Sequence, residues 1–492
     1  MKRIKLVDTT IRDGQASLWA MNMRTRHMLP AMPHLDAAGF DSIEFIATGS
    51  RLKKFVRHLK EDPWDWIRQG AAAARHTPLR WHGPIDGPSM SGRVPPELGE
   101  LLIEKAVELG IRYTRTGNNW NDYSSMGREL KRFERLGMTP VINVMYSVSP
   151  RHTDEYFVRK ARDAAALRPF RLCFKDVGGL LTPDRTRALL PSMIRAAGDV
   201  PWEFHGHCNN GLGPLNALEA AKAGVAYIHT AVPPLANASS QPSVHNVARN
   251  LRALGFDVDV DDEALRPVSA HFEFIARREK FQVGTPYEYD ERLYRHQIPG
   301  GMISNLRYQL ELAGVEDRLD EVLEEAGRVR ADFGYPIMVT PLSQFVGSQA
   351  AINVIVGERY RQVTDKAIEY ALGMHGGAEA LDAMDPDVRD KILGRPRARE
   401  IAGDQPPQPS LAELRERYGR DVCDEDLILR AIVGDDAVDV VGSAAETRRH
   451  TTKDRPLLHL IREIGERDGP RYVSVRKGGF SLTMRKAQEG TP

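Results

Sequence analysis

Cysteine is scarce in this sequence, with only Cys173, Cys208 and Cys423 among 492 residues. Three scattered thiols are too few for a disulfide framework or a four-thiolate zinc site, and they fit a reducing compartment. Long apolar runs are also missing: no stretch of about 18 apolar residues occurs, and the N-terminus MKRIKLVDTT contains no apolar leader. We therefore expect a cytoplasmic protein that does not cross a membrane.

An excess of charge of either sign is absent as well. Lysine and arginine together number 68 against 67 aspartate and glutamate residues, which gives a formal net charge of +1. Neither nucleic acid nor an anionic membrane is therefore expected as the main partner. The sequence also lacks internal repeats and low-complexity tracts, and its length predicts two or three globular domains.

Short apolar runs rich in β-branched residues recur along the first half of the chain, and each precedes a longer amphipathic stretch. The helical patterns include residues 97–109, 154–167, 184–197 and 214–223, and several begin with Pro, Thr or Asp, as helices often do. The eight predicted strands begin near Ile4, Ser42, Leu79, Ile111, Val141, Arg171, Trp202 and Ala226. Strands that alternate with helices pair in parallel, so we expect a (β/α)8 TIM barrel over residues 1–285 with its active site at the C-terminal strand ends.

The pattern changes after Phe256, where charged helical stretches such as residues 305–312, 319–325 and 363–372 become dominant. These predict a mostly helical second domain over residues 286–400 that completes the active-site funnel.

A short C-terminal extension is expected beyond a linker at residues 401–410. The linker contains AGDQPPQPS, whose proline and polar content cannot continue a helix. In the extension, residues 411–492, the part from 411 to 440 has a helical pattern. The segment YVSVRKGGFSLTM at 472–484 alternates around a Gly-Gly pair, which is typical of a β-hairpin.

Two imidazoles, His205 and His207, stand two residues apart at the end of the seventh strand, in WEFHGHC. Residues i and i+2 of a strand point to the same face, so both rings project together into whatever that strand lines. This arrangement is typical of metal ligands, although two partly buried polar residues can have the same spacing by chance. Cys208 alternates to the opposite face, so we interpret it as a packing residue rather than as a ligand or nucleophile.

Two further candidate ligands follow other strands. Asp13 lies just beyond the first strand in DTTIRD, where its carboxylate suits a divalent cation. The alternative is that Asp8 and Asp13 cap the next helix or pair with Arg12. Lys175 ends the sixth strand, where burial favours a neutral amine, a partner or covalent conversion. Carbamylation by carbon dioxide would make Lys175 an oxygen ligand, whereas a buried network with Asp176 needs no metal.

Four motifs carry a resemblance to a known family. The segment DTTIRDGQASLWAMNMRT at residues 8–25 resembles the opening of the biotin-dependent carboxyltransferase domains of pyruvate carboxylase, the transcarboxylase central subunit and the oxaloacetate decarboxylase alpha subunit. These belong to the metal-dependent TIM barrels related to HMG-CoA lyase. The other motifs similar to this family are LCFKDVGGLLTP at 172–183, HGHCNNGLG at 205–213 and SSQPS at 239–243. The resemblance covers residues 1–434 in order and includes LKEDPW at 59–64, HQIPGGMISNL at 296–306 and YPIMVTPLSQFVGSQAAINVIVGERY at 335–360.

The resemblance implies a divalent ion, either zinc, manganese or cobalt, held by Asp13, His205, His207 and a carbamylated Lys175. Such an ion acts as a Lewis acid on a substrate carbonyl and stabilises the enolate. Ser239 stands where the family has a threonine that moves a proton between biotin and substrate, so the hydroxyl is retained. Outside the resemblance, a serine in such a loop is more simply a turn residue that bonds its own backbone.

The sequence also departs from the family. After the third strand the family has an arginine in Arg-Gly-Gln-Asn, which holds the substrate carboxylate, and then a tyrosine; residues 81–97 read WHGPIDGPSMSGRVPPE instead. A guanidinium fork is hard to replace in carboxylate recognition, so plain pyruvate is not the expected substrate. The family glutamine three positions beyond the metal aspartate is Ala16 here, with Gln15 beside it.

The remaining candidate site residues lie beside these motifs. Arg12 and Gln15 flank Asp13 and are candidates for catalysis, together with Lys175 and Ser239. The candidates for contact with a small carbonyl substrate are Arg115, Asn118 and Tyr146. The first two could equally be solvated loop residues.

We expect the carboxyltransferase subunit of a multisubunit biotin-dependent carboxylase or decarboxylase, which transfers carbon dioxide between carboxybiotin and a metal-bound, enolisable carbonyl compound. One alternative is a biotin-independent acyl lyase or Claisen-type synthase, and another is a catalytically silent assembly subunit. Single-chain relatives end in a biotinyl domain with an Ala-Met-Lys-Met tip, whereas Lys486 follows Met484 and Arg485 near the end of this chain. The expected partners are therefore a separate biotin carboxyl carrier protein, a biotin carboxylase subunit and further copies of the chain.

Overall fold

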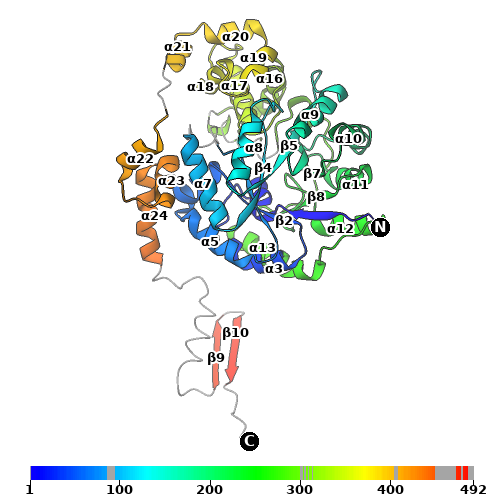
Figure 1. Cartoon of the computed structure of the whole chain (residues 1–492), viewed down its shortest axis with the longest axis vertical. Coiled ribbons are helices and arrows are strands. Elements are labelled where there is room, and N and C mark those ends of the chain that lie inside the picture. The colour runs from blue at the N-terminus through cyan, green and yellow to red at the C-terminus, as the bar shows by residue number, and fades with distance from the viewer. Residues whose placement is uncertain are drawn as a thin grey trace, which may run out of the picture.

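Eight parallel strands close into a barrel in the computed structural model (Figure 1), which confirms the predicted TIM-barrel fold. The structure describes residues 2–85, 95–299, 303, 306–307, 310–312, 314–403, 408–448, 472–477 and 480–485. The barrel strands, in their order around the barrel, are β1 (Lys5–Asp8), β2 (Ser42–Ala47), β3 (Leu79–His82), β4 (Ile111–Thr116), β5 (Thr139–Met145), β6 (Arg171–Asp176), β7 (Trp202–Gly206) and β8 (Tyr227–Thr230).

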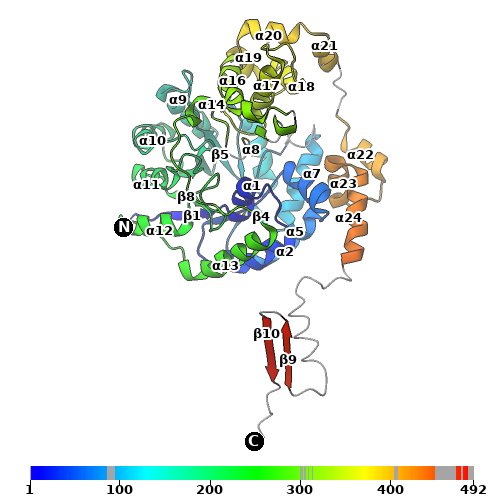
Figure 2. The ribbon, with the colours of Figure 1, turned by 180° about the vertical axis from the view of Figure 1, so that it is seen from behind.

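Helices surround the barrel, as Figures 1 and 2 show from opposite sides. They are α1 (Gln15–Leu18), α2 (Thr25–Met28), α3 (Met32–Ala37), α4 (Ser50–Lys53), α5 (Pro63–Ala73), α7 (Pro96–Glu108), α8 (Met126–Arg135), α9 (Asp154–Ala166), α10 (Pro183–Ala197), α11 (Gly213–Ala223), α12 (Val244–Ala253) and α13 (Asp262–Glu279). The chain also forms the π-helices η1 (Thr10–Gly14) and η3 (Lys54–Leu59) and the 3₁₀ helix η2 (Leu29–Ala31).

The starts of these helices follow from local sequence. Thr182 caps α10 by accepting a hydrogen bond from the Arg185 amide, and Pro183 occupies the first turn, where its missing N–H costs nothing. Thr153 caps α9 in the same way. These caps fix the loops that leave the C-terminal ends of the strands.

Side chains alternate between the barrel axis and the helical layer. Strands β6 and β7 pair so that Lys175 lies beside His205 and Cys173 beside Glu203. All four side chains face inward, whereas the alternate residues Phe174 and Phe204 lie in the main hydrophobic core. The barrel axis therefore carries an unusually polar set of side chains.

A second hydrophobic core belongs to the helices that follow the barrel. They are α14 (Leu293–His296), η4 (Glu316–Arg318), α16 (Leu319–Asp332), α17 (Leu342–Val356), α18 (Asp365–Ala371), α19 (Gly377–Ala383), α20 (Pro386–Leu393) and α21 (Pro396–Gly403). They contact the loops beyond the C-terminal strand ends, because Arg330 donates to Ser147 after β5 and Asn119 after β4 donates to the Thr340 carbonyl. The expected helix at residues 305–312 lies partly outside the described residues.

The chain then returns to the side of the barrel. Helices α22 (Leu411–Tyr418), α23 (Asp424–Val433) and α24 (Asp435–Arg448) lie beside α7 in Figures 1 and 2, and their buried leucines and isoleucines belong to the barrel core. Trp64 of α5 donates its indole N–H to the Glu425 carbonyl. The sequence predicts the helical character of this extension but gives no sign of this packing.

An antiparallel hairpin of β9 (Tyr472–Lys477) and β10 (Phe480–Arg485) confirms the predicted strand pair. Its Gly-Gly turn, Lys486, residues 404–407 of the expected linker and residues 86–94 of the segment after β3 lie outside the described residues. Among the helices of the described chain, none is both long and apolar enough to span a bilayer.

Candidate metal centre

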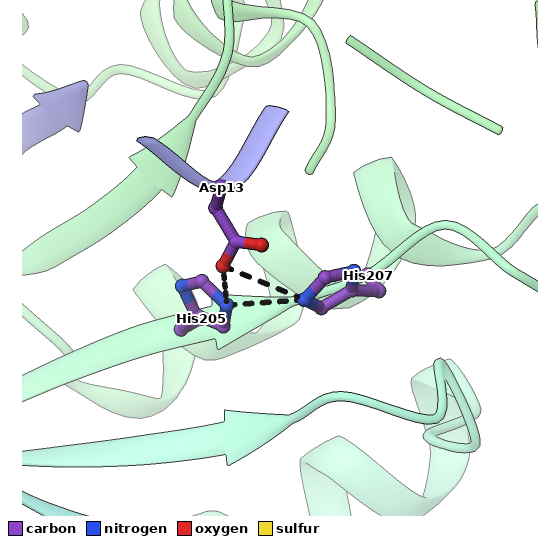
Figure 3. A group of neighbouring side chains, drawn as sticks. All are labelled: Asp13, His205 and His207. Carbon is purple, nitrogen blue, oxygen red and sulfur yellow. Dashed lines mark hydrogen bonds and ion pairs between the residues drawn. The ribbon is translucent and has the colours of Figure 1, made fainter. Parts of the chain in front are cut away.

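Three side chains, one from the start of the barrel sequence and two from near its end, lie together at the C-terminal edge of the barrel (Figure 3). His205 lies near the end of β7, His207 follows this strand, and Asp13 lies in the turn η1 after β1. The Asp13 Oδ2 atom is 3.0 Å from the His205 Nε2 and 3.7 Å from the His207 Nε2, and the two imidazole nitrogens are 3.2 Å apart. We call Asp13, His205 and His207 the donor cluster.

The proton on His207 is fixed by the backbone. Its Nδ1 lies 2.7 Å from the Ser239 carbonyl oxygen, which can only accept a hydrogen bond. The His207 Nδ1 therefore carries the proton, and its Nε2 presents a lone pair to the other members of the donor cluster. This is the tautomer required of an imidazole that binds a metal through Nε2.

The charge states within the donor cluster also suit a cation. Burial opposes ionisation of Asp13, but Arg12 and the two histidines hold the pKa of this carboxyl well below its usual range. Burial and the charge of Arg115 hold the pKa of His205 well below its usual range, so the ring is neutral. One carboxylate and two neutral imidazoles form a donor set suited to a divalent transition metal.

Lys175 lies beside the donor cluster, because β6 pairs with β7 so that Lys175 is opposite His205. Burial and the nearby Arg115 charge lower the pKa of its amine to about 7. Within the described part of the chain its ammonium has no hydrogen-bonding or ion-pairing partner. The Asp176 carboxylate accepts instead from the amides of Leu180 and Leu181, so it does not form the alternative network with Lys175.

The loop after β6 can approach the donor cluster because of a glycine. Gly179 has a φ of +63°, and a Cβ there would lie 2.9 Å from the His207 carbonyl oxygen and 2.9 Å from the Asn209 nitrogen. Only glycine fits such a close approach at positive φ. This loop and the His207 loop are thereby held side by side.

Glu44 accepts hydrogen bonds from two arginines, Arg12 and Arg115, that lie next to the donor cluster. Arg12 donates its Nε to one oxygen of Glu44 at 2.8 Å and an Nη to Asp13 at 2.8 Å. Arg115 donates its Nε to the other Glu44 oxygen at 2.8 Å and is fully buried. Arg12 therefore orients Asp13, whereas Arg115 lies beneath the cluster and is enclosed by Glu44 and Asn143.

The loop with SSQPS lies against the donor cluster. Ser239 donates its hydroxyl to the Ser17 carbonyl at 3.0 Å, and the Ser17 hydroxyl lies 3.3 Å from the Asp13 Oδ1. The Gln241 amide nitrogen lies 3.3 Å from the His205 Nε2 and 3.0 Å from the His207 Nε2. Gln241 escaped the sequence predictions, although the SSQPS motif contains it.

Three of the sequence candidates are not brought to the donor cluster. Gln15 turns away and binds the Ile11 carbonyl and the Met23 amide. Asn118 uses its side-chain oxygen to accept the Trp120 amide in a turn. Tyr146 packs against Phe157 in a tilted arrangement and against Phe174 edge to face, in the layer between the barrel and its helices. Alternation points it away from the barrel axis.

Cys208 lies where alternation places it. It is buried, burial raises the pKa of its thiol, and a Cβ on Gly213 would overlap its sulfur. This environment fits the packing role expected from the sequence.

A second polar layer lies deeper in the barrel, and we call it the ion-pair layer: Asp41, Arg80, Arg171 and Glu203. Arg80 binds both oxygens of Glu203 at 2.7 and 2.8 Å, and Arg171 binds Asp41 at 2.7 Å and Glu203 at 3.1 Å. The predictions missed this layer. Its signal in the sequence is the period of two that places Arg171 two residues before Cys173, and Glu203 two before His205.

Two other groups of side chains in the described chain bring potential ligand atoms together. They are Glu44 with His205 and His229, and Cys173 with Glu203 and His229. In both, the carboxylate already accepts hydrogen bonds from a buried arginine, Arg115 or Arg80. The Asp13 carboxylate also accepts from an arginine, Arg12, but the donor cluster lies at the C-terminal strand ends, where TIM barrels hold their active sites, and it is therefore the best place for a cation.

Comparison with known proteins gives a consistent result. A family described as "Conserved carboxylase domain" matches residues 293–461, and one described as "HMGL-like" matches residues 125–271. The chain is 34% identical over 395 residues to a pyruvate carboxylase subunit of Methanocaldococcus jannaschii, covering 79% of this chain and 68% of the relative. It is 32% identical over 442 residues to the 2-oxoglutarate carboxylase large subunit of Hydrogenobacter thermophilus, covering 88% and 67%.

A third relative is the methylmalonyl-CoA carboxyltransferase 5S subunit of Propionibacterium freudenreichii subsp. shermanii, at 29% identity over 391 residues, 79% of this chain and 76% of the relative. Among solved structures, the carboxyl transferase domain of Rhizobium etli pyruvate carboxylase with 3-hydroxypyruvate matches with a TM-score of 0.80 at 23% identity, covering 90% of this chain and 78% of that one. A complete multifunctional pyruvate carboxylase from the same organism matches with a TM-score of 0.81 at 22% identity, covering 98% and 49%. These structures have the same fold.

Proposed function

The chain belongs to the carboxyltransferase family of the biotin-dependent carboxylases, and from this premise we propose that it transfers carbon dioxide between carboxybiotin on a separate carrier protein and an enolisable carbonyl acceptor. The observation that carries the proposal is the donor cluster in the mouth of the barrel, where one carboxylate and two neutral imidazoles converge. A catalytically silent subunit has no need of such a buried donor set.

The residues present fit a divalent metal ion such as zinc, manganese or cobalt. Asp13, His205 and His207 would hold it, with Lys175 as a further ligand after carbamylation. The lowered pKa of Lys175 supports this role, because only the neutral amine reacts with carbon dioxide. When bound, the ion supplies a Lewis acid that polarises the acceptor carbonyl.

The side chains around the donor cluster have distinct roles in this proposal. Arg12 binds Asp13 and Glu44 together and so orients the carboxylate. Ser239 donates its hydroxyl to the backbone carbonyl of another segment, that of Ser17. Rotation of this hydroxyl away from Ser17 would allow Ser239 to move a proton between biotin and the acceptor.

The acceptor that we propose is a carbonyl compound other than pyruvate. His82 ends β3 and lies in the segment in which the family sequence has its carboxylate-binding arginine. Burial and the charges of Arg12 and Arg115 hold the pKa of His82 well below its usual range, so its ring is neutral and cannot form an ion pair with a carboxylate. The Nδ1 of His82 is buried without a partner among the described residues, which leaves it free to bind a neutral polar group.

The partners that we propose are a biotin carboxyl carrier protein and a biotin carboxylase subunit, with the chain itself forming a homo-oligomer. Support comes from the relatives, which are named as subunits of pyruvate carboxylase, 2-oxoglutarate carboxylase and methylmalonyl-CoA carboxyltransferase.

The test combines partner capture with an assay. The chain is purified from its own cells with its partners, which are probed with streptavidin and identified by mass spectrometry. We expect a biotinylated polypeptide to accompany an unlabelled chain, and we expect the complex to transfer carboxyl groups to a neutral or larger carbonyl compound more efficiently than to pyruvate. A complex without biotin, or a chain that cleaves an acyl compound without biotin, would replace the proposal with the lyase or synthase alternative.

A further inference from the structure

Gln241 is a fully buried side chain that contacts both histidines of the donor cluster. Its amide nitrogen lies 3.0 Å from the Nε2 of His207 and 3.3 Å from the Nε2 of His205. These separations resemble those inside the donor cluster, where the ligand atoms are 3.0, 3.2 and 3.7 Å apart. Adjacent ligands that each lie about 2.1 Å from one metal ion are about 3.0–3.4 Å from each other. The end of the Gln241 side chain therefore lies where a fourth ligand would be.

The backbone holds Gln241 at this place. The amide of Cys208, the residue after His207, donates to the Ser240 carbonyl at 2.8 Å. The Gln241 carbonyl accepts from the amide of Asn237 at 2.7 Å. The loop that carries Gln241 is therefore tied to the segment that carries the two histidines.

The hydroxyl of Thr9 indicates which end of the amide suits its surroundings. Its oxygen lies 2.9 Å from the Thr230 carbonyl oxygen and 2.8 Å from the Oε1 of Gln241. Both neighbours are acceptors, and a hydroxyl has one proton, so one of these two contacts is made without a hydrogen bond. A half turn of the Gln241 amide would place its NH2 group beside Thr9. The amide would then donate to Thr9, and Thr9 would donate to Thr230.

The same half turn would bring the amide oxygen to the donor cluster. Before an ion binds, the amide nitrogen can donate to an imidazole nitrogen, which is its present orientation. A bound cation would repel these N–H groups and attract the carbonyl oxygen of the amide. The half-turned amide therefore satisfies both the ion and the hydroxyl of Thr9.

We propose that Gln241 is a further ligand of the divalent metal ion, which it binds through Oε1 after a half turn of its amide. The inference rests on the proposed metal centre. An amide oxygen adds no charge to the ligand set but increases its share of oxygen atoms. This favours an ion that takes more than four ligands, such as manganese, over zinc in tetrahedral geometry.

A ligand role and a packing role predict opposite orders for two variants. Gln241→Met fills a similar volume but has no oxygen, whereas Gln241→Glu keeps an oxygen at the same place and adds a negative charge. If Gln241 only packs against the histidines or donates to them, Gln241→Met is the milder change, because a second carboxylate would share the His205 Nε2 with Asp13. If Gln241 binds the ion, Gln241→Glu is the milder change.

The experiment measures cobalt(II) binding to the full metal-free chain by titration calorimetry. The visible absorption of the bound cobalt is recorded as well, because it depends on the number and geometry of the ligands. We expect Gln241→Met to bind cobalt about 10–100-fold more weakly and with a changed spectrum. Gln241→Glu should bind at least as tightly as the unmodified chain.

Gln349→Met is the matched control, because Gln349 is also fully buried but contacts Asn353 and the Gln362 carbonyl among the helices that follow the barrel. It should keep both the cobalt affinity and the spectrum. Unchanged affinity and spectrum in folded Gln241→Met, or a greater loss in Gln241→Glu than in Gln241→Met, would overturn the inference.

A second measurement needs no variant. In the unmodified chain with ¹⁵N in its glutamine side chains, zinc should shift the NH2 signals of Gln241, because this group moves from the histidines to Thr9. A spectrum in which no NH2 signal moves while zinc binds would overturn the ligand role alone. An unmodified chain that binds neither zinc nor cobalt would overturn the proposed metal centre and the ligand role with it.

Discussion

The ion-pair layer and the donor cluster lie in the same barrel interior, but their polar side chains are arranged differently. In the ion-pair layer, two guanidinium groups face two carboxylates, and each carboxylate oxygen of Glu203 accepts from an arginine. In the donor cluster, an oxygen and two nitrogens face one another within 3.7 Å. The first layer consists of charged pairs alone, and the second combines one carboxylate with two imidazoles.

The difference indicates that the ion-pair layer stabilises the barrel, whereas the donor cluster is suited to bind a ligand. A buried charge needs a partner of opposite charge, and Asp41 and Glu203 have theirs within the chain. Asp13 also has a charged partner, Arg12, which it shares with Glu44, and Arg115 completes the pairing of Glu44. What distinguishes the donor cluster is that two imidazole nitrogens lie beside its carboxylate. A metal ion would bind these three ligand atoms together.

The largest expected effect comes from breaking the ion-pair layer. Arg80→Met keeps most of the side-chain length but leaves Glu203 with a buried, poorly compensated charge, so the free energy of unfolding should fall by about 3–5 kcal/mol. Urea denaturation followed by circular dichroism measures this loss. Arg187→Met is the control, because Arg187 makes its ion pairs on the surface and should change stability little. Equal losses in both variants would contradict the contrast between the layers.

A substitution in the donor cluster should lower the affinity for metal more than it lowers stability. Asp13→Asn removes the only carboxylate of the cluster, so cobalt affinity should fall at least about 100-fold and turnover should be lost. Without metal, its stability should drop less than that of Arg80→Met. Titration calorimetry and urea denaturation of the same preparation give both numbers, with Asp184→Asn on the exposed start of α10 as the control. Full cobalt affinity in Asp13→Asn would remove Asp13 from the site.

Metal addition should distinguish the two layers by a smaller change in the free energy of unfolding. At a free cobalt concentration of about ten times the Kd, ligand linkage should stabilise the unmodified chain by about 1.4 kcal/mol. The same addition should leave Asp13→Asn unchanged but should stabilise Arg80→Met, if that variant folds, because its donor cluster is intact. Thermal unfolding with cobalt and with a chelator checks this. A gain in Asp13→Asn would point to binding elsewhere.

The smallest expected effect is a pH dependence at Lys175. With a pKa of about 7, the neutral amine should increase about tenfold from pH 6 to pH 8, and carbon dioxide should strengthen cobalt binding in parallel. The sign for stability follows from linkage: the folded pKa lies below the ordinary 10.5, so the unfolded chain holds more protons between the two values and stability rises with pH there.

Lys175→Met provides the control for this pH dependence. The variant has no amine to carbamylate, so its cobalt affinity should no longer respond to carbon dioxide. A response that persists in Lys175→Met would separate the effect from Lys175 and return this lysine to a structural role.

The sequence by itself determined the barrel. Eight β-branched runs, each followed by an amphipathic helix with a recognisable start, have few other ways to bury their apolar faces. It also determined that His205 and His207 share a face, because alternation in a strand is a local property. The chemistry near Asp13 could be predicted for the same reason, since Asp13 follows closely on the end of β1.

Only the tertiary structure decided which charges meet. Gln15 was expected near the site but binds the backbone, and Gln241, far along the chain, lies there instead. Alternation could have placed Tyr146 outside the barrel, yet Arg115 could not be assigned to Glu44 without the closure of the barrel. Closure sets the register between strands, and the register decides which inward side chains lie level with one another. That is why the contacts of His229 with Glu203 and with His205 have no trace in the linear sequence.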